Sequence, residues 1–136
     1  MIRMTETVLA ELIEHARRDA PLEACGYLGG KDGIITVCYP MKNIDSSGEH
    51  FSLDPEEQFS VFRDIRKNNK TLAAVYHSHP DSPARPSVED IRLAYDPDIH
   101  YVIVSLMGGV ESVNSFLIKD SVVKPEGIEV FDHTMA

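Results

Sequence analysis

The sequence lacks several features that mark large classes of proteins. It has no tryptophan and only two cysteines, Cys25 and Cys38, which do not stand in a Cys-x-x-Cys arrangement. Two cysteines are too few for a disulfide framework, so we expect free thiols in buried positions. No apolar run approaches the roughly 20 residues that a membrane-spanning helix needs. These absences argue against a disulfide-rich secreted domain and against a membrane-spanning protein.

Basic residues are also scarce. Thirteen Lys and Arg stand against 22 Asp and Glu, which gives a formal net charge of −9. This balance argues against nucleic acid or an anionic membrane surface as the main partner. Residues 1–18 carry acids early and lack the apolar block and the small-residue cleavage site of a signal peptide. We therefore expect a cytoplasmic protein.

The length of 136 residues fits a single domain spanning 1–136. Residues 5–18 predict a helix, because apolar side chains recur at helical spacing and Thr5 can cap the first turn. Residues 54–65 predict a second helix, which begins with an acidic turn that contains a proline. We expect three apolar residues to form the buried stripe of this second helix: Phe59, Phe62 and Ile65.

Apolar runs predict the strands. Residues 23–30 and 31–40 fit a hairpin that turns at Lys31-Asp32, in which Cys25 and Cys38 would face each other. Residues 71–79 are almost continuously apolar before their histidines, which is typical of a central strand covered on both faces. Three later runs predict further strands, the last at an edge: 100–106, 113–119 and 127–131. The expected fold class is α/β (α+β), with one mixed sheet flanked by helices.

The stretch VYHSHPDSPARPSVED, residues 75–90, contains most of the candidate functional residues. His77 and His79 end the central strand and lie on one of its faces, because side chains alternate along a strand. Ser87-x-x-Asp90 opens a predicted short helix and can be a capping box. The Asp90 carboxylate can instead converge with the two imidazoles on one ion. Three protein ligands plus water make up a catalytic zinc site, and this interpretation accounts for more of the stretch than a cap does.

A site that activates water also needs a base, and Glu23 is the candidate. It stands between Leu22 and Ala24, at the start of an apolar strand and outside any run of charge. An acid in that place is a poor choice for solubility alone. The alternative is a glutamate at a strand edge that faces solvent.

These residues together resemble a known family motif. Glu23, then His77-Ser78-His79-Pro80, then six residues and Ser87-Val88-Glu89-Asp90, resemble the JAMM motif of the MPN-plus metalloproteases. The segments PLEACGYLGG and FSLDP also resemble the corresponding segments of the short bacterial and archaeal members. The resemblance covers nearly the whole chain.

The resemblance implies a role for each motif residue. One Zn²⁺ per chain would be held by His77, His79 and Asp90, with water as the fourth ligand. Glu23 would be the general base, and Ser87 would hydrogen-bond the oxyanion. The implied fold is the one shared with cytidine deaminases, a curved mixed sheet between helices. The implied function is a zinc metallopeptidase or isopeptidase that cuts after the C-terminal Gly-Gly of a ubiquitin-like sulfur-carrier protein.

Two other functions remain open. The chain can be a non-catalytic MPN-type module that binds or scaffolds a ubiquitin-fold protein. A deaminase of the related fold would need His-x-Glu followed by Pro-Cys-x-x-Cys, which this sequence lacks. Arg85 and Arg92 flank the candidate site and can either hold a substrate carboxylate or simply be solvated. Three further histidines are expected at the surface: His50, His100 and His133.

Zinc titration tests the candidate ligand set. In calorimetry, metal-free protein is expected to bind zinc at one tight site per chain, because three ligands converge on one ion. The His79→Ala variant lacks one of these ligands and is expected to lose the site. Absence of a specific site in the unaltered protein would leave Ser87 and Asp90 as a helix cap only.

Overall fold

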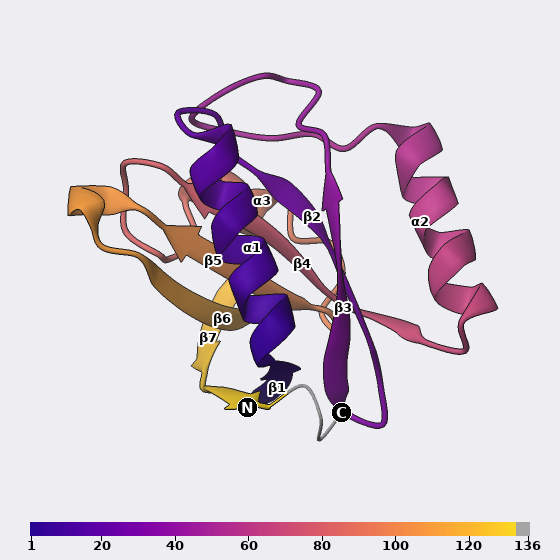
Figure 1. Ribbon diagram of the computed structural model, residues 1–136. Coiled ribbons are helices and arrows are strands. Elements are labelled where there is room, and N and C mark those ends of the chain that lie inside the picture. The colour runs from indigo at the N-terminus through magenta and orange to yellow at the C-terminus, as the bar shows by residue number, and fades with distance from the viewer. Residues whose placement is uncertain (133–136) are drawn as a thin grey trace.

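The computed structural model describes residues 1–132 (Figure 1). The described helices are α1 (Glu6–Asp19), α2 (Pro55–Lys67) and α3 (Val88–Arg92), with a short 3₁₀ turn at Met107–Gly109. The described strands are β1 (Ile2–Thr5), β2 (Cys25–Lys31), β3 (Ile34–Met41), β4 (Thr71–His79), β5 (His100–Ser105), β6 (Ser112–Lys119), β7 (Val122–Glu126) and β8 (Ile128–Phe131). No helix within residues 1–132 is both long enough and apolar enough to cross a membrane.

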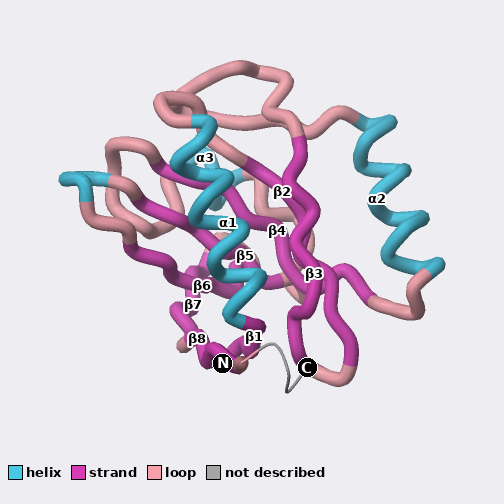
Figure 2. Tube along the Cα trace, in the orientation of Figure 1, coloured by secondary structure: helices cyan, strands magenta, loops and turns pink. Residues whose placement is uncertain are grey.

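All eight strands belong to one curved mixed sheet, as the sequence predicts. Their order is β7-β6-β5-β4-β2-β3-β1-β8 (Figure 2). The central strand β4 pairs parallel with β5 and antiparallel with β2. The predicted edge position of β8 is confirmed. The sequence analysis missed β1, which is only four residues long, and β7, which contains a proline and few apolar side chains.

The helix α1 crosses one face of the sheet and forms the main core with it (Figure 1). Its cap is the predicted one, because the Thr5 side chain accepts a hydrogen bond from the Val8 backbone N–H. Its apolar stripe, which includes Leu12, packs on residues of β2, β4 and β5. Ala74 and Tyr76 are the members of this core from β4. Because side chains alternate along a strand, the odd-numbered residues of β4 from Val75 onward point to the opposite face of the sheet.

That opposite face carries a smaller apolar cluster and, beside it, the end of β4. Ile103 and Phe116 belong to the cluster, and Ile103 lies opposite His77 in the β4–β5 pairing. The loop between β3 and α2 arches over the end of the sheet where β2 begins (Figure 2). Because β2 and β4 are antiparallel, the start of one and the end of the other lie together under this loop.

The predicted buried stripe of α2 is wrong at two of its three positions. Ile65 is 1% exposed, but Phe62 is 41% and Phe59 is 65% exposed. Figure 1 shows α2 set to one side of the sheet, so that little of its surface is covered. Phe62 packs on the ring of Tyr27, and the Arg63 guanidinium lies 5.0 Å from the centre of the Phe59 ring. Helical spacing gives the direction of an apolar stripe but not how much of it a neighbour covers.

The expected pairing of the two cysteines is also wrong. The hairpin turns at Asp32 and Gly33, which both have positive φ, one residue later than predicted. An irregularity at Gly29/Gly30 shifts the register further, so that Cys25 lies opposite Met41 and Leu28 lies opposite Cys38. Both thiols are free and buried, as expected.

The position of α2 gives a test of the packing. Replacing Ile65 by Ala is expected to lower the free energy of unfolding by about 2–4 kcal/mol, because it empties a fully buried site. Replacing the exposed Phe59 by Ser is expected to change it by less than about 0.5 kcal/mol. Urea denaturation of both variants measures the difference, and equal losses would contradict the described packing of α2.

Candidate metal centre

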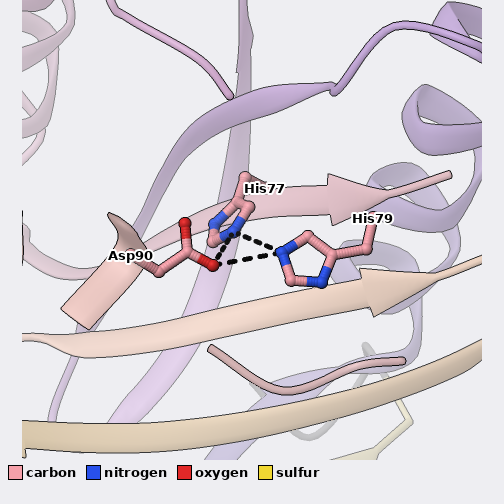
Figure 3. Close-up of side chains that lie close together, drawn as sticks. All are labelled: His77, His79 and Asp90. Carbon is pink, nitrogen blue, oxygen red and sulfur yellow. Dashed lines mark hydrogen bonds and ion pairs between the residues drawn. The ribbon is translucent and has the colours of Figure 1, made fainter. Parts of the chain in front are cut away.

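Two histidine side chains project from the end of β4 on the face opposite α1. His77 and His79 are buried, and their Nε2 atoms lie 3.2 Å apart (Figure 3). They share a face because they are two residues apart on a strand, as the sequence predicts. Their position on the central strand fixes their backbone from both sides, through β2 and β5.

The carboxylate of Asp90 reaches the same point from α3. Its Oδ2 atom lies 3.0 Å from Nε2 of His77 and 3.1 Å from Nε2 of His79 (Figure 3). Candidate ligand atoms of these three residues all lie within 4.8 Å of one another. The structure thus brings together the predicted ligand set.

Asp90 also completes the capping box of α3. The backbone N–H of Ser87 donates to Asp90 Oδ2 over 2.9 Å, and the backbone N–H of Asp90 donates to Ser87 Oγ over 3.0 Å. The sequence leaves a cap and a ligand as competing roles for Asp90. The cap is present, and the same carboxylate oxygen faces both the helix N-terminus and the two imidazoles, so the cap does not exclude the ligand role.

Neighbouring groups hold the two imidazole rings in place. Nδ1 of His79 lies 2.8 Å from the carbonyl oxygen of Pro83 and donates to it, because a carbonyl can only accept. The lone pair of a neutral His79 is therefore on Nε2, which faces Asp90. The ring of Phe51 stacks on His77 at a centroid distance of 4.8 Å. The sequence analysis assigned no role to Phe51 or to the Pro83 carbonyl, because both act through the folded loops.

The electrostatics of the cluster favour a cation. Burial alone would raise the pKa of the Asp90 carboxyl, but hydrogen bonds from His77 and His79 outweigh it and lower that pKa. Burial alone would lower the pKa of His79, but its bonds to Asp90 and Pro83 raise it. His79 can donate from both nitrogens only as an imidazolium. A metal ion would supply the same positive charge to the neutral ring, so the residues fit a metal ion with nitrogen and oxygen ligands.

Glu23 lies next to this cluster, two residues before β2 begins. It is 3% exposed, and its Oε1 atom has no hydrogen-bond partner among the described residues. Burial raises the pKa of the Glu23 carboxyl to about 8, and the charges of Asp90 and Glu89 add to the effect. The alternative of a glutamate that faces solvent is therefore wrong.

The backbone around Glu23 is tied to β4 and to the loop above it. The Ala24 N–H donates to Ser78 Oγ over 2.7 Å, and the Ser78 N–H donates to the Ala24 carbonyl over 2.9 Å. The Asn43 side chain donates to the Glu23 carbonyl over 3.1 Å, and the Glu23 N–H donates to Ser47 over 2.7 Å. These bonds fix the base candidate relative to the strand that carries the histidines.

Two cavities flank the cluster. One, here called the apolar groove, has a volume of about 470 Å³, and its lining includes His77, Asp90, Tyr27, Phe51 and Phe62. The other, here called the polar cavity, has a volume of about 640 Å³. Its lining consists of Glu23, Ser47, Gly48, Glu49, His79, Asp81, Ser82 and Ser87. The three candidate ligands thus stand between an apolar and a polar space.

The sequence profile of a family described as prokaryotic homologs of the JAB domain matches residues 5–119. This range contains Glu23, both histidines, Ser87 and Asp90. The chain belongs to the prokaryotic JAB-domain family.

Three similar proteins have names that describe an activity. A CysO-cysteine peptidase of Mycobacterium tuberculosis is 37% identical over 124 residues, which cover 89% of this JAB-domain chain and 85% of that protein. A desampylase of Haloferax volcanii is 33% identical and covers 74% of each chain. A probable TtuB-protein conjugate cleaving protease of Thermus thermophilus is 31% identical and covers 90% of this chain and 76% of the other.

Solved structures share the JAB-domain fold. The solution structure of a Desulfitobacterium hafniense protein is 45% identical and has a TM-score of 0.88 over 97% of this chain and 94% of the other. A JAB1/MPN domain protein of Archaeoglobus fulgidus is 18% identical, with a TM-score of 0.68 over 96% of this chain and all of the other. The fold predicted from the motif is therefore confirmed.

The remaining polar residues singled out in the sequence lie outside the cluster. Arg85 and Arg92 line neither cavity, and Arg92 pairs with Glu89 at 3.5 Å. His50 is exposed, bonds Asp45 and borders the apolar groove. His100 is half-buried and pairs with Glu126, and His133 lies outside the described residues.

The raised pKa of Glu23 predicts a pH-dependent effect on stability. The Glu23 carboxyl has a pKa of about 8 in the folded protein and 4.5 in the unfolded protein, so below pH 4.5 it is protonated in both states and does not lower stability. As the pH rises from 4.5 toward 8, ionisation favours the unfolded state and lowers the free energy of unfolding. In metal-free protein at pH 8, Glu23→Gln is therefore expected to raise the free energy of unfolding by on the order of 3 kcal/mol. The gain is expected to vanish near pH 4, below the unfolded pKa of 4.5. Urea denaturation at both pH values measures it, and a gain independent of pH would contradict the burial of the charge.

Proposed function

We propose that this JAB-domain protein is a zinc metallopeptidase that hydrolyses the amide bond after the C-terminal Gly-Gly of a ubiquitin-like protein. One observation carries the proposal. A buried carboxyl without a hydrogen-bond partner among the described residues, Glu23, shares a cavity with His79 and Ser87 beside the His77–His79–Asp90 cluster. A scaffold has no use for a carboxylate held at this cost in stability.

The residues that would hold one Zn²⁺ per chain are His77, His79 and Asp90. Two imidazole nitrogens and one carboxylate oxygen match the three protein ligands of catalytic zinc sites. When bound, zinc supplies Lewis-acid activation of water and of the scissile carbonyl. The hydrogen bond from His79 Nδ1 to Pro83 keeps Nε2 available as the ligand atom.

Glu23 is the general base and then the general acid of the reaction. It takes a proton from the attacking water while the new carbon–oxygen bond forms. It then gives that proton to the amide nitrogen while the carbon–nitrogen bond breaks, so that water and amide become a carboxylic acid and an amine. Transfer of the acid's proton to the amine then leaves a carboxylate and an ammonium group. A pKa of about 8 suits both transfers, because it lies near the working pH.

Ser87 stabilises the charge that develops on the carbonyl oxygen. Its Oγ atom already accepts a hydrogen bond from the Asp90 N–H, which fixes the position of the hydroxyl. The hydroxyl proton is thereby left to donate toward the oxyanion. The cap of α3 thus positions a hydrogen-bond donor as well as a candidate ligand.

The apolar groove receives the chain on the acyl side of the scissile bond. Two glycines have no side chains, so their backbone can approach the buried ligand atoms closely. Relatives named for acting on CysO-cysteine and on TtuB-protein conjugates support a substrate of this kind. The partner we propose is a ubiquitin-like sulfur-carrier protein, or a conjugate of one.

A deaminase of the related fold has less support. The zinc deaminases bind their metal through cysteines. Here Cys25 and Cys38 are both buried, and burial raises the pKa of each thiol to about 12. Neither cysteine belongs to the candidate ligand group of the described residues.

Glu23→Gln separates catalysis from metal binding. The variant keeps all three candidate ligands, so it is expected to bind one zinc per chain with unchanged stoichiometry. Cleavage of a Gly-Gly fusion is expected to fall about 10²–10⁴-fold, because no group remains to move the proton. Rates are measured on zinc-loaded protein, with Asp120→Asn as a surface control. Full activity in Glu23→Gln would remove Glu23 from the mechanism, and an inert unaltered protein would favour the non-catalytic module.

A further inference from the structure

The polar cavity is lined only by polar side chains and by Gly48, and three of these side chains are acidic. Glu49 and Asp81 contribute exposed carboxylates, and Glu23 contributes a buried one. The eight residues that line the cavity include no Lys and no Arg. A negatively charged group that entered the cavity would therefore meet charges of its own sign and no guanidinium or ammonium.

The position of Glu23 indicates which part of the substrate enters this cavity. Under the proposed function, on which this inference rests, Glu23 delivers a proton to the leaving nitrogen and must lie within hydrogen-bond reach of it. Glu23 lines the polar cavity and does not line the apolar groove. The leaving amine therefore lies in the polar cavity, and the acyl part of the substrate lies in the groove.

The unpartnered Oε1 atom of Glu23 is the independent sign of a ligand here. Glu23 lines the cavity, and this oxygen is buried and has no hydrogen-bond donor among the described residues. The leaving N–H is a group that can donate to it. The cavity thus provides a hydrogen-bond acceptor for an amine, together with three serines and two further carboxylates. Its lining contains no basic side chain that could bind an acid.

Leaving groups fall into two classes by charge. When a single amino acid is released, its free α-carboxylate is attached to the carbon next to the leaving nitrogen, so it must enter the cavity with that nitrogen. When the nitrogen belongs to a lysine side chain, or to a peptide that continues, no carboxylate lies close to it. Arg85 and Arg92, the two residues that could have held a carboxylate, do not line the cavity.

We infer that the polar cavity selects leaving amines that carry no adjacent carboxylate. The substrate class is then a ubiquitin-like protein joined through its Gly-Gly end to a lysine side chain or to a further stretch of peptide. Adducts of a single free amino acid are poor substrates, so this chain would differ in preference from its relative named CysO-cysteine peptidase. Glu49 and Asp81 are the residues that determine this specificity.

Two matched substrates that differ only in the charge of the leaving group test the selection. A ubiquitin-like domain that ends in Gly-Gly-Ala with a free carboxylate is compared with the same domain ending in Gly-Gly-Ala carboxamide. Zinc-loaded protein is expected to cleave the carboxamide with about tenfold higher kcat/KM, because like charges a few ångströms apart repel each other. An isopeptide to the Nε atom of Nα-acetyl-lysine amide is expected to behave like the carboxamide.

Paired variants assign the preference to the cavity. The double variant Glu49→Gln/Asp81→Asn is expected to narrow the preference to about twofold, mainly by faster cleavage of the free acid. Glu11→Gln/Asp120→Asn removes the same formal charge from exposed positions outside the cavity and is expected to keep the preference. Equal narrowing by both pairs would assign the effect to the overall charge of the protein and overturn the inference.

A binding measurement distinguishes this inference from the proposed function. The Glu23→Gln variant is titrated with the two Ala substrates, and the carboxamide is expected to bind about tenfold more tightly. Equal binding, or tighter binding of the free acid, overturns the inference. If the binding preference is present but the unaltered protein cleaves neither substrate, the proposed function fails while the charge selection stands.

Discussion

A single carboxylate oxygen, Oδ2 of Asp90, connects the parts of this site. It lies about 3 Å from two imidazole nitrogens and from the backbone N–H of Ser87. The end of the central strand, the start of a five-residue helix and the proline-containing loop between them must all be in register for these contacts to form. A buried acid with two imidazoles against it is stable only with a positive charge among them, whether a proton or a metal ion. The fold thereby favours the binding of a cation between these three side chains.

The second constraint is the loss of stability caused by burying the Glu23 carboxyl. Its carboxyl is withdrawn from water and placed near other acids, which destabilises its charged form. Proteins keep such groups mainly where a reaction uses them. The backbone at Glu23 and Ala24 is hydrogen-bonded to neighbouring segments, so the point from which the carboxyl projects is fixed. The same bonds hold the candidate general base beside the histidines.

The sequence predicted the site better than it predicted the packing around it. His77, His79 and Asp90 were predictable because strand alternation and the capping pattern are local rules, and the spacing of the motif carried the rest. The exposure of Phe59 and Phe62 was not predictable, because it depends on where α2 lies relative to the sheet. The partners of Cys25 and Cys38 were missed because the turn lies one residue later than predicted and an irregular strand pairing shifts the register further. The stacking of Phe51 on His77 arises only when a distant loop meets β4, and the bond from His79 to the Pro83 carbonyl depends on how the loop after β4 folds back, so no simple sequence pattern predicts either contact.

The hydrogen bonds between Ser78 and Ala24 also bear on how such a site can be rebuilt in another protein. The residue between the two histidines, Ser78, points to the other face of the sheet, where its hydroxyl oxygen accepts a hydrogen bond from the backbone N–H of Ala24. Copying the histidines and the aspartate onto a new strand and helix would leave out this link. The smallest unit that can be grafted is therefore a pair of antiparallel strands in the register that sets Cys25 opposite His77, together with α3 and its cap. In protein design, omitting Ser78, which contacts neither a metal ion nor a substrate, would therefore misplace the candidate base Glu23.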